Sequence, residues 1–289
     1  MRRSLILLVL IVFLSCCGMA TLCARAQETK IPPPTANKPQ ETKTPPINPG
    51  SVANPTAEMV AEAVIFTNGG RAGLNQVRRN GIENGRVSKI LDDGRTEDDR
   101  YELKFIRGEN STKDKVRIDH KTPQLDYSLV SSGGKVFGIV NGSSFTPRAD
   151  ASASFVADRV HSIDALLRYK ENDSKLTLVR KDKQKGVEFF VVDLTNKDNQ
   201  RTRYYVSTKT GHVLRLEYEE TPPGAVVPTK YEKHFHDYRY AQGAWIPFRT
   251  VMIQDGKQVL ETRILTVTYG VKMEDALFQN PDQVSAANP

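Results

Sequence analysis

Residues 201–220, RTRYYVSTKTGHVLRLEYEE, and residues 233–270, KHFHDYRYAQGAWIPFRTVMIQDGKQVLETRILTVTYG, decide the fold. Both stretches have the pattern of long antiparallel hairpins. Gly211, Gly243 and Gly256 stand where tight turns need residues that adopt positive φ. The short segment MEDALFQNP at 273–281 closes the run. A large paired sheet without a polar catalytic cluster favours binding over catalysis.

The alternating pattern also extends upstream of these hairpins. Further strands are expected at 85–91, 101–107, 115–120, 125–130, 135–140, 175–180 and 187–194, separated by turn signals rich in Gly, Asn, Asp and Pro. Within the second of them, Tyr101, Leu103 and Phe105 share one face, and mostly polar residues occupy the other. This pattern predicts a sheet covered on one side. The fold class is therefore α+β, with eleven or twelve antiparallel strands and few helices.

Two helical segments are expected, one before the strands and one among them. The first follows Thr56, a plausible N-cap, and ends at Gly69-Gly70. The second is an amphipathic helix, or a pair of helices, at 152–167, with Asp150 or Ser152 as its cap. Its apolar stripe, at intervals of three or four residues, consists of Val156, Val160, Ile163 and Leu167.

The N-terminus has the features of a secretory leader. Arg2 and Arg3 precede an apolar run at 5–14, and Ala24-Arg25-Ala26 forms a cleavage site. We expect cleavage after Ala26 and export to the periplasm or cell envelope. A signal anchor is the alternative, because the apolar stretch continues loosely to residue 22.

All three cysteines, Cys16, Cys17 and Cys23, lie inside this leader. After cleavage the chain has no thiol, which excludes disulfides, a cysteine nucleophile and a cysteine zinc site. Lipidation at Cys16 or Cys17 is the alternative. Removing three leader arginines and no acid lowers the formal net charge from +7 to +4. Basic and acidic residues are interleaved along the chain, so no nucleic-acid partner is expected.

Composition divides the rest of the chain into three parts. Residues 27–55 hold eight of the sixteen prolines and almost no large apolar residues, which predicts a disordered tether. Residues 56–281 have the length of one folded domain, and residues 282–289 are expected to be a disordered tail. The tether is interpreted as a spacer, with partner docking through its prolines as the alternative.

Candidate catalytic residues are few. His234 and His236 project from one strand face and are the best metal candidates, but no third ligand follows from the spacing. His120, His161 and His212 are isolated and interpreted as surface histidines. No nucleophile elbow, phosphate loop or HExxH motif occurs. We therefore expect no enzyme activity, no metal and no cofactor; a hydrolase site assembled across the sheet is the remaining alternative.

The C-terminal motifs resemble those of a known family. YVSTKTGHVLRLEY at 205–218, YRYAQGAWIPFRTV at 238–251 and MEDALFQNP at 273–281 are similar to the periplasmic lipoprotein carrier and sorting family, LolA/LolB-like with RseB-type relatives. The resemblance covers residues 175–281. It implies an unclosed β half-barrel of about eleven strands around helices that act as a lid or plug. For the arginine that holds the lid of such carriers closed, Arg107 and Arg117 are the candidates.

The resemblance implies lipid binding in an apolar hollow. The expected ligand is the acyl chain of a lipid or lipoprotein, with a carrier or sorting role, a possible envelope protein partner and peripheral membrane contact. The alternative is an envelope sensor or interaction module of the same fold. The residues expected to line the hollow are Leu103, Phe105, Phe137 and Val140 from strands, and Val156, Val160, Ile163 and Leu167 from the lid.

Overall fold

The computed structural model describes residues 54–91 and 93–283. The chain divides into two units, Met1–Thr44 and Pro45–Pro289, and the first lies outside the described residues. The expected leader, its cleavage site and nearly all of the expected tether therefore also lie outside them. Of the expected tail at 282–289, only Asp282 and Gln283 are described.

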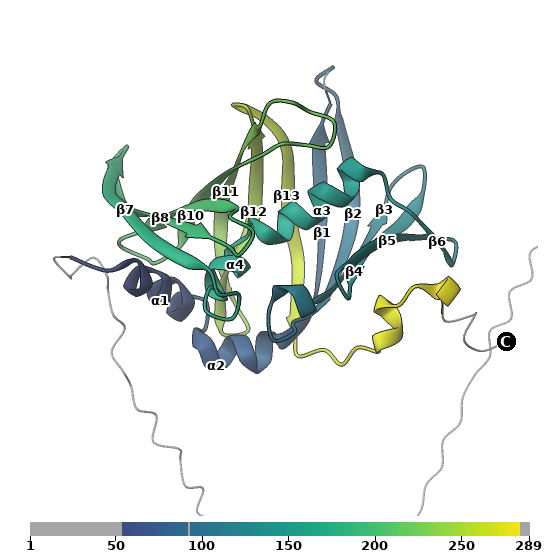
Figure 1. The fold of residues 1–289 in the computed structure, drawn as a ribbon, viewed down its shortest axis with the longest axis horizontal. Helices are drawn as coiled ribbons and strands as arrows, with labels where there is room; N and C mark the ends of the chain where they lie inside the picture. The colour runs from purple at the N-terminus through teal and green to yellow at the C-terminus, as the bar shows by residue number, and fades with distance from the viewer. Residues whose placement is uncertain (1–53, 92, 284–289) are drawn as a thin grey trace, which may run out of the picture. The chain divides into compact units, whose positions relative to one another are not determined.

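A single antiparallel sheet of thirteen strands dominates the second unit (Figure 1). The strands are β1 (Asn80–Ile90), β2 (Thr96–Ile106), β3 (Lys115–Lys121), β4 (Asp126–Ser132), β5 (Lys135–Val140), β6 (Ser143–Phe145), β7 (Lys175–Gln184), β8 (Val187–Thr195), β9 (Arg201–Ser207), β10 (Val213–Glu220), β11 (Thr229–Ala241), β12 (Ala244–Gln254) and β13 (Lys257–Tyr269). Their order is β6-β5-β4-β3-β2-β1-β13-β12-β11-β10-β9-β8-β7. The predicted unclosed antiparallel half-barrel is confirmed, with thirteen strands in place of the eleven or twelve expected.

The hairpin turns form as their residues predict. Gly211 has φ 69°, the pair Gln242 and Gly243 has φ 46° and 88°, and Asp255 and Gly256 have φ 46° and 80°. Two successive positive φ values are those of a type I′ turn, whose twist matches that of the strands it joins. These turns set the register of the long β11–β12 and β12–β13 ladders.

The helical elements are α1 (Ala57–Thr67), α2 (Gly70–Asn75), η2 (Val77–Arg79), η3 (Ser111–Lys113), α3 (Ala149–Val160), α4 (Ile163–Leu167) and η4 (Asp275–Phe278). None of the helices in the described part of the chain is long and apolar enough to cross a membrane. The predicted N-cap of α1 is confirmed, because Thr56 Oγ1 accepts a hydrogen bond from the Met59 amide at 3.2 Å. Figure 1 shows α3 and α4 lying against one face of the sheet.

The main core lies between this face and the helices α1 and α4. Six of the eleven residues of α1 are buried, and Val60 and Val64 are fully inaccessible to solvent. They pack with Leu166 and Leu167 of α4 and with inward side chains of β8, β9 and β10, among them Phe190, Tyr204 and Leu216. This core fills the half of the sheet that ends at β7.

Of the two arrangements expected for residues 152–167, one helix or a pair of helices, the structure has the pair. His161 and Ser162 leave helical geometry, with φ/ψ of −103°/71° and −136°/165°. Ser162 Oγ then accepts a hydrogen bond from the Ala165 amide at 3.2 Å and caps α4. A serine in this position favours a helix start over helix continuation. The first helix begins at Ala149, after Arg148, and neither Asp150 nor Ser152 caps it.

Candidate functional site on the concave face

The two edges of the sheet are consecutive strands in the sequence. β6 and β7 lie at opposite ends of the strand order, and the chain between them contains α3 and α4. The connection therefore runs across the open side of the half-barrel. We call the sheet face that α1, α3 and α4 contact the concave face.

Contacts at the end of α3 show how strongly the sheet curves. Asp158 contacts Lys233 on β11, and the next residue, Arg159, contacts Ser131 on β4. Five strands separate β4 from β11 in the sheet order. At about 4.8 Å per strand they would be roughly 29 Å apart in a flat sheet. Two adjacent side chains cannot span that distance, so β4 and β11 must face each other across α3.

Lys233 anchors the last turn of α3. Its Nζ donates to Asp158 Oδ1 and to the His161 carbonyl, both at 2.7 Å, and to the Asp158 carbonyl at 3.3 Å. Its side chain is only 5% exposed, whereas that of Asp158 is 68% exposed. A buried ammonium group needs such partners, and a cation at a helix C-terminus also stabilises the helix dipole.

Arg159 makes the second set of polar contacts. It donates to Ser131 Oγ at 2.9 Å, to the Ser111 carbonyl at 3.3 Å and to Asp114 at 3.5 Å. By comparison, α3 buries little apolar surface against the sheet. Ala157 is the only residue of this twelve-residue helix that is buried. Polar contacts at its last turn, rather than burial, hold α3 against the sheet.

His161 fixes the junction between α3 and α4. It is fully buried, stacks on Tyr218 at a ring distance of 3.9 Å, and contacts Thr202 Oγ1 at 2.6 Å and Glu220 Oε1 at 3.1 Å. Burial, with a smaller contribution from the positive charge of Lys233, lowers the pKa of His161 to about 3. The contact with Glu220 is thus a hydrogen bond of a neutral ring. The interpretation of His161 as a surface histidine is wrong.

Arginines hold α4 on its other side. Arg107 donates from Nε to Asp164 at 3.3 Å, also through Nη2 to the same carboxylate, and to the Arg78 carbonyl. Arg168 donates to Asp114 at 2.8 Å and to the Gly108 carbonyl at 2.9 Å. Arg107 and Arg117 were the candidates for an arginine that holds the helical lid closed. Arg107 does contact the helical segment, through Asp164 of α4. Arg117 lies on the other sheet face, where it donates to the Leu277 carbonyl at 3.1 Å.

An acid lies on the concave face below α3. Glu83 accepts a hydrogen bond from the Tyr101 hydroxyl at 2.6 Å. Burial raises the pKa of Glu83 to about 7, and the negative charge of Asp158 on α3 adds to this rise. Tyr101 can lie this close because Gly85 faces it; a Cβ at Gly85 would be 2.5 Å from the ring. The sequence interpretation missed Glu83. Its inward position on β1, between Gly81 and Gly85, was the available signal.

The register places three of the four expected strand residues on the concave face. Leu103 pairs with Glu83 and Ile118, and Phe105 pairs with Gly81 and Val116. Gly138 pairs with Leu129, which in turn pairs with Ile118, so Gly138 lies on this face. Val140 is two residues further along β5 and therefore shares it. Leu103, Phe105 and Val140 are all partly buried.

The expected inward position of Phe137 is wrong. Phe137 pairs with Val130, which pairs with Arg117, so it shares the opposite, outer face with them. Successive strand residues alternate faces, and Phe137 and Val140 are an odd number of residues apart. The 3-10 helix η4 covers this part of the outer face, with Phe278 fully buried.

The four expected lid residues are not equivalent. Val156 is 43% exposed, and Val160 is partly buried near the end of α3. Ile163 packs against the main core, and Leu167 is a fully buried member of it. The break at His161 thus separates a loosely packed half of the stripe from a half that belongs to the core.

The two metal candidates lie on the same strand, β11, with one carboxylate beside them. His234 and His236 have ring centroids 6.5 Å apart, and Glu232 contacts the ring of His234 at 3.1 Å. Within residues 54–91 and 93–283, no group of three or more His, Cys, Asp or Glu residues could hold a metal ion.

The arrangement of the sheet and helices matches solved structures. A LolA superfamily protein of Nitrosomonas europaea aligns with a TM-score of 0.53 and 11% identity over 78% of this chain and 98% of its own. The chain has the LolA fold. A Vibrio parahaemolyticus domain described as an outer membrane lipoprotein-sorting protein gives 0.54 and 12%, over 79% and 97% of the two chains. A DUF1329 family protein of Desulfovibrio piger gives 0.56 and 12%, over 79% and 99%. No protein-family model and no curated protein matches the sequence.

Proposed function

We propose that this chain is an exported protein of the periplasm or cell envelope that binds the acyl chain of a lipid or lipoprotein on its concave face. Its role is that of a carrier or sorting protein, and it does not act as an enzyme. Helix α3 is the displaceable lid, and the main core with α1 and α4 is the fixed part. One observation carries the proposal: in α3 only Ala157 is buried, whereas more than half of α1 is buried.

Apolar side chains of the concave face suit an apolar ligand. Leu103 and Phe105 are partly buried on the concave face, so each has apolar surface that an acyl chain bound there would cover. Each buried methylene contributes about 0.8 kcal/mol. A long chain therefore offsets the loss of the polar contacts at the end of α3. The lipoprotein-sorting description of the Vibrio domain is consistent with this ligand.

Binding of chains of increasing length tests the proposal. Residues 27–289, purified and delipidated, are titrated with saturated fatty acids of twelve and sixteen carbons. Four methylenes at about 0.8 kcal/mol each correspond to an affinity ratio of roughly 200. Native mass spectrometry of the protein before delipidation is expected to show a bound acyl lipid. Equal affinities for the two chains, or no binding, would contradict the proposal.

A pair of variants separates the concave face from apolar surface in general. Leu103→Gln is expected to weaken binding at least about tenfold, because it places an amide where the chain lies. Leu265→Gln is the control, since Leu265 is 53% exposed at the bulge in β13. Both variants must keep the melting temperature within a few degrees of the unaltered chain.

The alternative role as an interaction module depends on the proline-rich segment 27–55. Nearly all of that segment lies outside the described residues. This alternative stays a prediction.

A further inference from the structure

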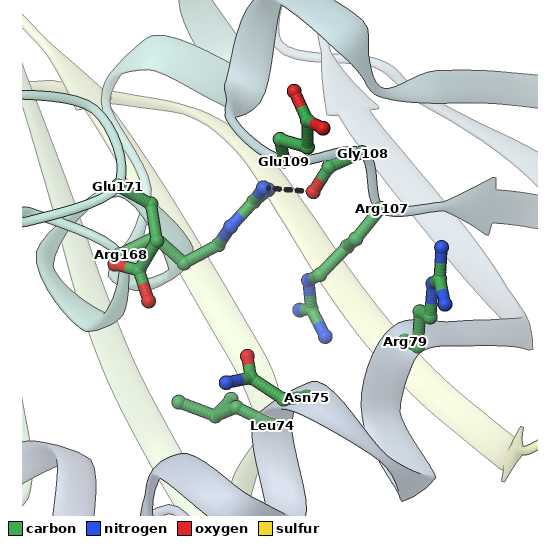
Figure 2. A pocket seen from close by; sticks show the side chains of 8 residues that line it. All are labelled: Leu74, Asn75, Arg79, Arg107, Gly108, Glu109, Arg168 and Glu171. Carbon is green, nitrogen blue, oxygen red and sulfur yellow. Dashed lines mark hydrogen bonds between the residues drawn. The ribbon is translucent and has the colours of Figure 1, made fainter.

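A cavity of about 380 Å³ lies at one end of the concave face (Figure 2). Its walls come from the end of α2, the end of η2, the turn that follows β2, and the chain after α4. The lining residues are Leu74, Asn75, Arg79, Arg107, Gly108, Glu109, Arg168 and Glu171. Nothing in the proposed acyl-binding role uses this cavity as such.

Two of the three arginines in the wall already have partners. Arg107 pairs with Asp164, and Arg168 pairs with Asp114 and donates to the Gly108 carbonyl. These bonds hold the two guanidinium groups in place, and their side chains are only 12% and 7% exposed. A guanidinium has five N–H donors, so Arg107 keeps donors that these bonds do not use.

Two other charged groups in the wall have unused capacity. Arg79 is exposed, and no carboxylate in the described part of the chain pairs with it. The Oε2 atom of Glu171 is buried without a hydrogen-bond partner. Its Oε1 atom is 3.4 Å from Arg71, but Arg71 has a closer partner in Glu62 at 2.6 Å. Figure 2 shows Arg79 and Glu171 on opposite sides of the cavity.

The cavity adjoins the apolar part of the concave face. The Arg107 guanidinium carbon lies 4.9 Å from the ring centroid of Phe105. Leu74 lines the cavity and also belongs to the main core. A chain lying over Phe105 could therefore place its polar end in the cavity.

We propose that this cavity binds the phosphoethanolamine head group of a lipid whose acyl chain lies on the concave face. The phosphate lies at Arg79 and the free donors of Arg107, and the ammonium group donates to Glu171. A head group with negative charge alone would leave the Oε2 atom of Glu171 without a donor. A choline head group has no N–H to offer it. This inference rests on the proposed acyl-binding function.

Short-chain lipids with three head groups test the inference. Dihexanoyl phosphatidylethanolamine, phosphatidylglycerol and phosphatidylcholine share their chains and phosphate, and are compared by calorimetric titration below their micelle concentrations. Phosphatidylethanolamine is expected to bind about tenfold more tightly than either of the others, the scale of one charge-assisted hydrogen bond. Free phosphoethanolamine is titrated separately, and is expected to bind more weakly than the lipid because it lacks the chains.

Two variants test which part of the head group each charged residue binds. Glu171→Gln is expected to remove the preference for phosphatidylethanolamine while leaving phosphatidylglycerol binding unchanged. Arg79→Gln is expected to weaken all three phospholipids. Arg86→Gln and Glu97→Gln, at exposed positions of β1 and β2, are the matched controls and should change nothing.

Equal affinity for the three lipids, or a preference that persists in Glu171→Gln, would overturn the head-group site. If fatty-acid affinity still depends on chain length in that case, acyl binding stands and only the head-group site fails. Tighter binding of free phosphoethanolamine than of the lipid would identify a soluble ligand instead, and would likewise overturn the lipid assignment.

Discussion

Replacement of Lys233 tests whether polar contacts hold α3 closed. Lys233→Met keeps most of the aliphatic stem and removes the ammonium group that contacts Asp158 and the His161 carbonyl. Hydrogen bonds to a charged group contribute roughly 1.5–3 kcal/mol each. Asp158 is largely exposed and regains water, so most of its share is discounted. The His161 carbonyl is buried, so losing its hydrogen bond to Lys233 has its full free-energy cost. Methionine removes the opposing cost of burying a charged group.

We estimate that the closed state of α3 loses about 2 kcal/mol relative to a state in which α3 has moved away from the sheet. This corresponds to a roughly 30-fold shift in that equilibrium. Amide hydrogen exchange measures it directly. Amides of residues 152–161 should exchange about 30-fold faster, and those of α1 should stay as protected as before.

Lys230→Met is the matched control, because Lys230 lies on the same strand, is 46% exposed and contacts only Glu217 and Glu232 in ion pairs. Its exchange pattern should equal that of the unaltered chain. Unchanged protection of α3 in Lys233→Met would refute the argument that polar contacts hold this helix. An equal loss of protection in α1 would also refute it, since the two helices would then open together.

Three further predictions concern stability. Glu83 has a folded-state pKa of about 7 against an ordinary value of 4.5, so the free energy of unfolding should fall by about 3 kcal/mol as pH rises from 4.5 to 7. Chemical denaturation of Glu83→Gln should not show this loss. An equal fall of the free energy of unfolding with pH in both proteins would contradict the prediction. The His161 pKa of about 3 lies below the ordinary 6.5, so stability should fall as pH drops from 6.5 towards 3, and His161→Asn should lack this contribution. A similar fall in the stability of His161→Asn would show that His161 is not the source of this pH dependence. Gly85→Ala places a Cβ 2.5 Å from the Tyr101 ring and should cost about 1–3 kcal/mol, whereas Gly73→Ala, with open space around it, should cost nothing in a thermal melt.

Local sequence patterns predicted most of the sheet. The turns at Gly211, Gly243 and Gly256 and the N-cap at Thr56 depend on residues within a few positions of each other. The alternation of Tyr101, Leu103 and Phe105 predicted their common face because strand geometry has a fixed period of two. Phe137 failed by the same rule, since its distance of three residues from Val140 already placed the two on different faces.

The helical segment shows where a pattern over one segment is insufficient. Val156, Val160, Ile163 and Leu167 have helical spacing, but the buried His161 interrupts the helix between them. Its ring is held by Thr202 and Glu220, which are 41 and 59 residues further along the chain. No periodicity in the segment itself contains that information.

The strands, their turns and the class of fold can be predicted from the sequence, because these depend on near neighbours in the chain. The site cannot, because its residues meet only when the chain has folded. Lys233 meets Asp158 across 75 residues because the curved sheet brings β11 to α3. Arg79 and Glu171 share a cavity, and Glu83 lies near Asp158 of α3, although the members of each pair are far apart in the sequence. Burial and pairing of these charges follow from the curvature of an unclosed sheet of thirteen strands around one helical connection, which no single stretch of sequence specifies.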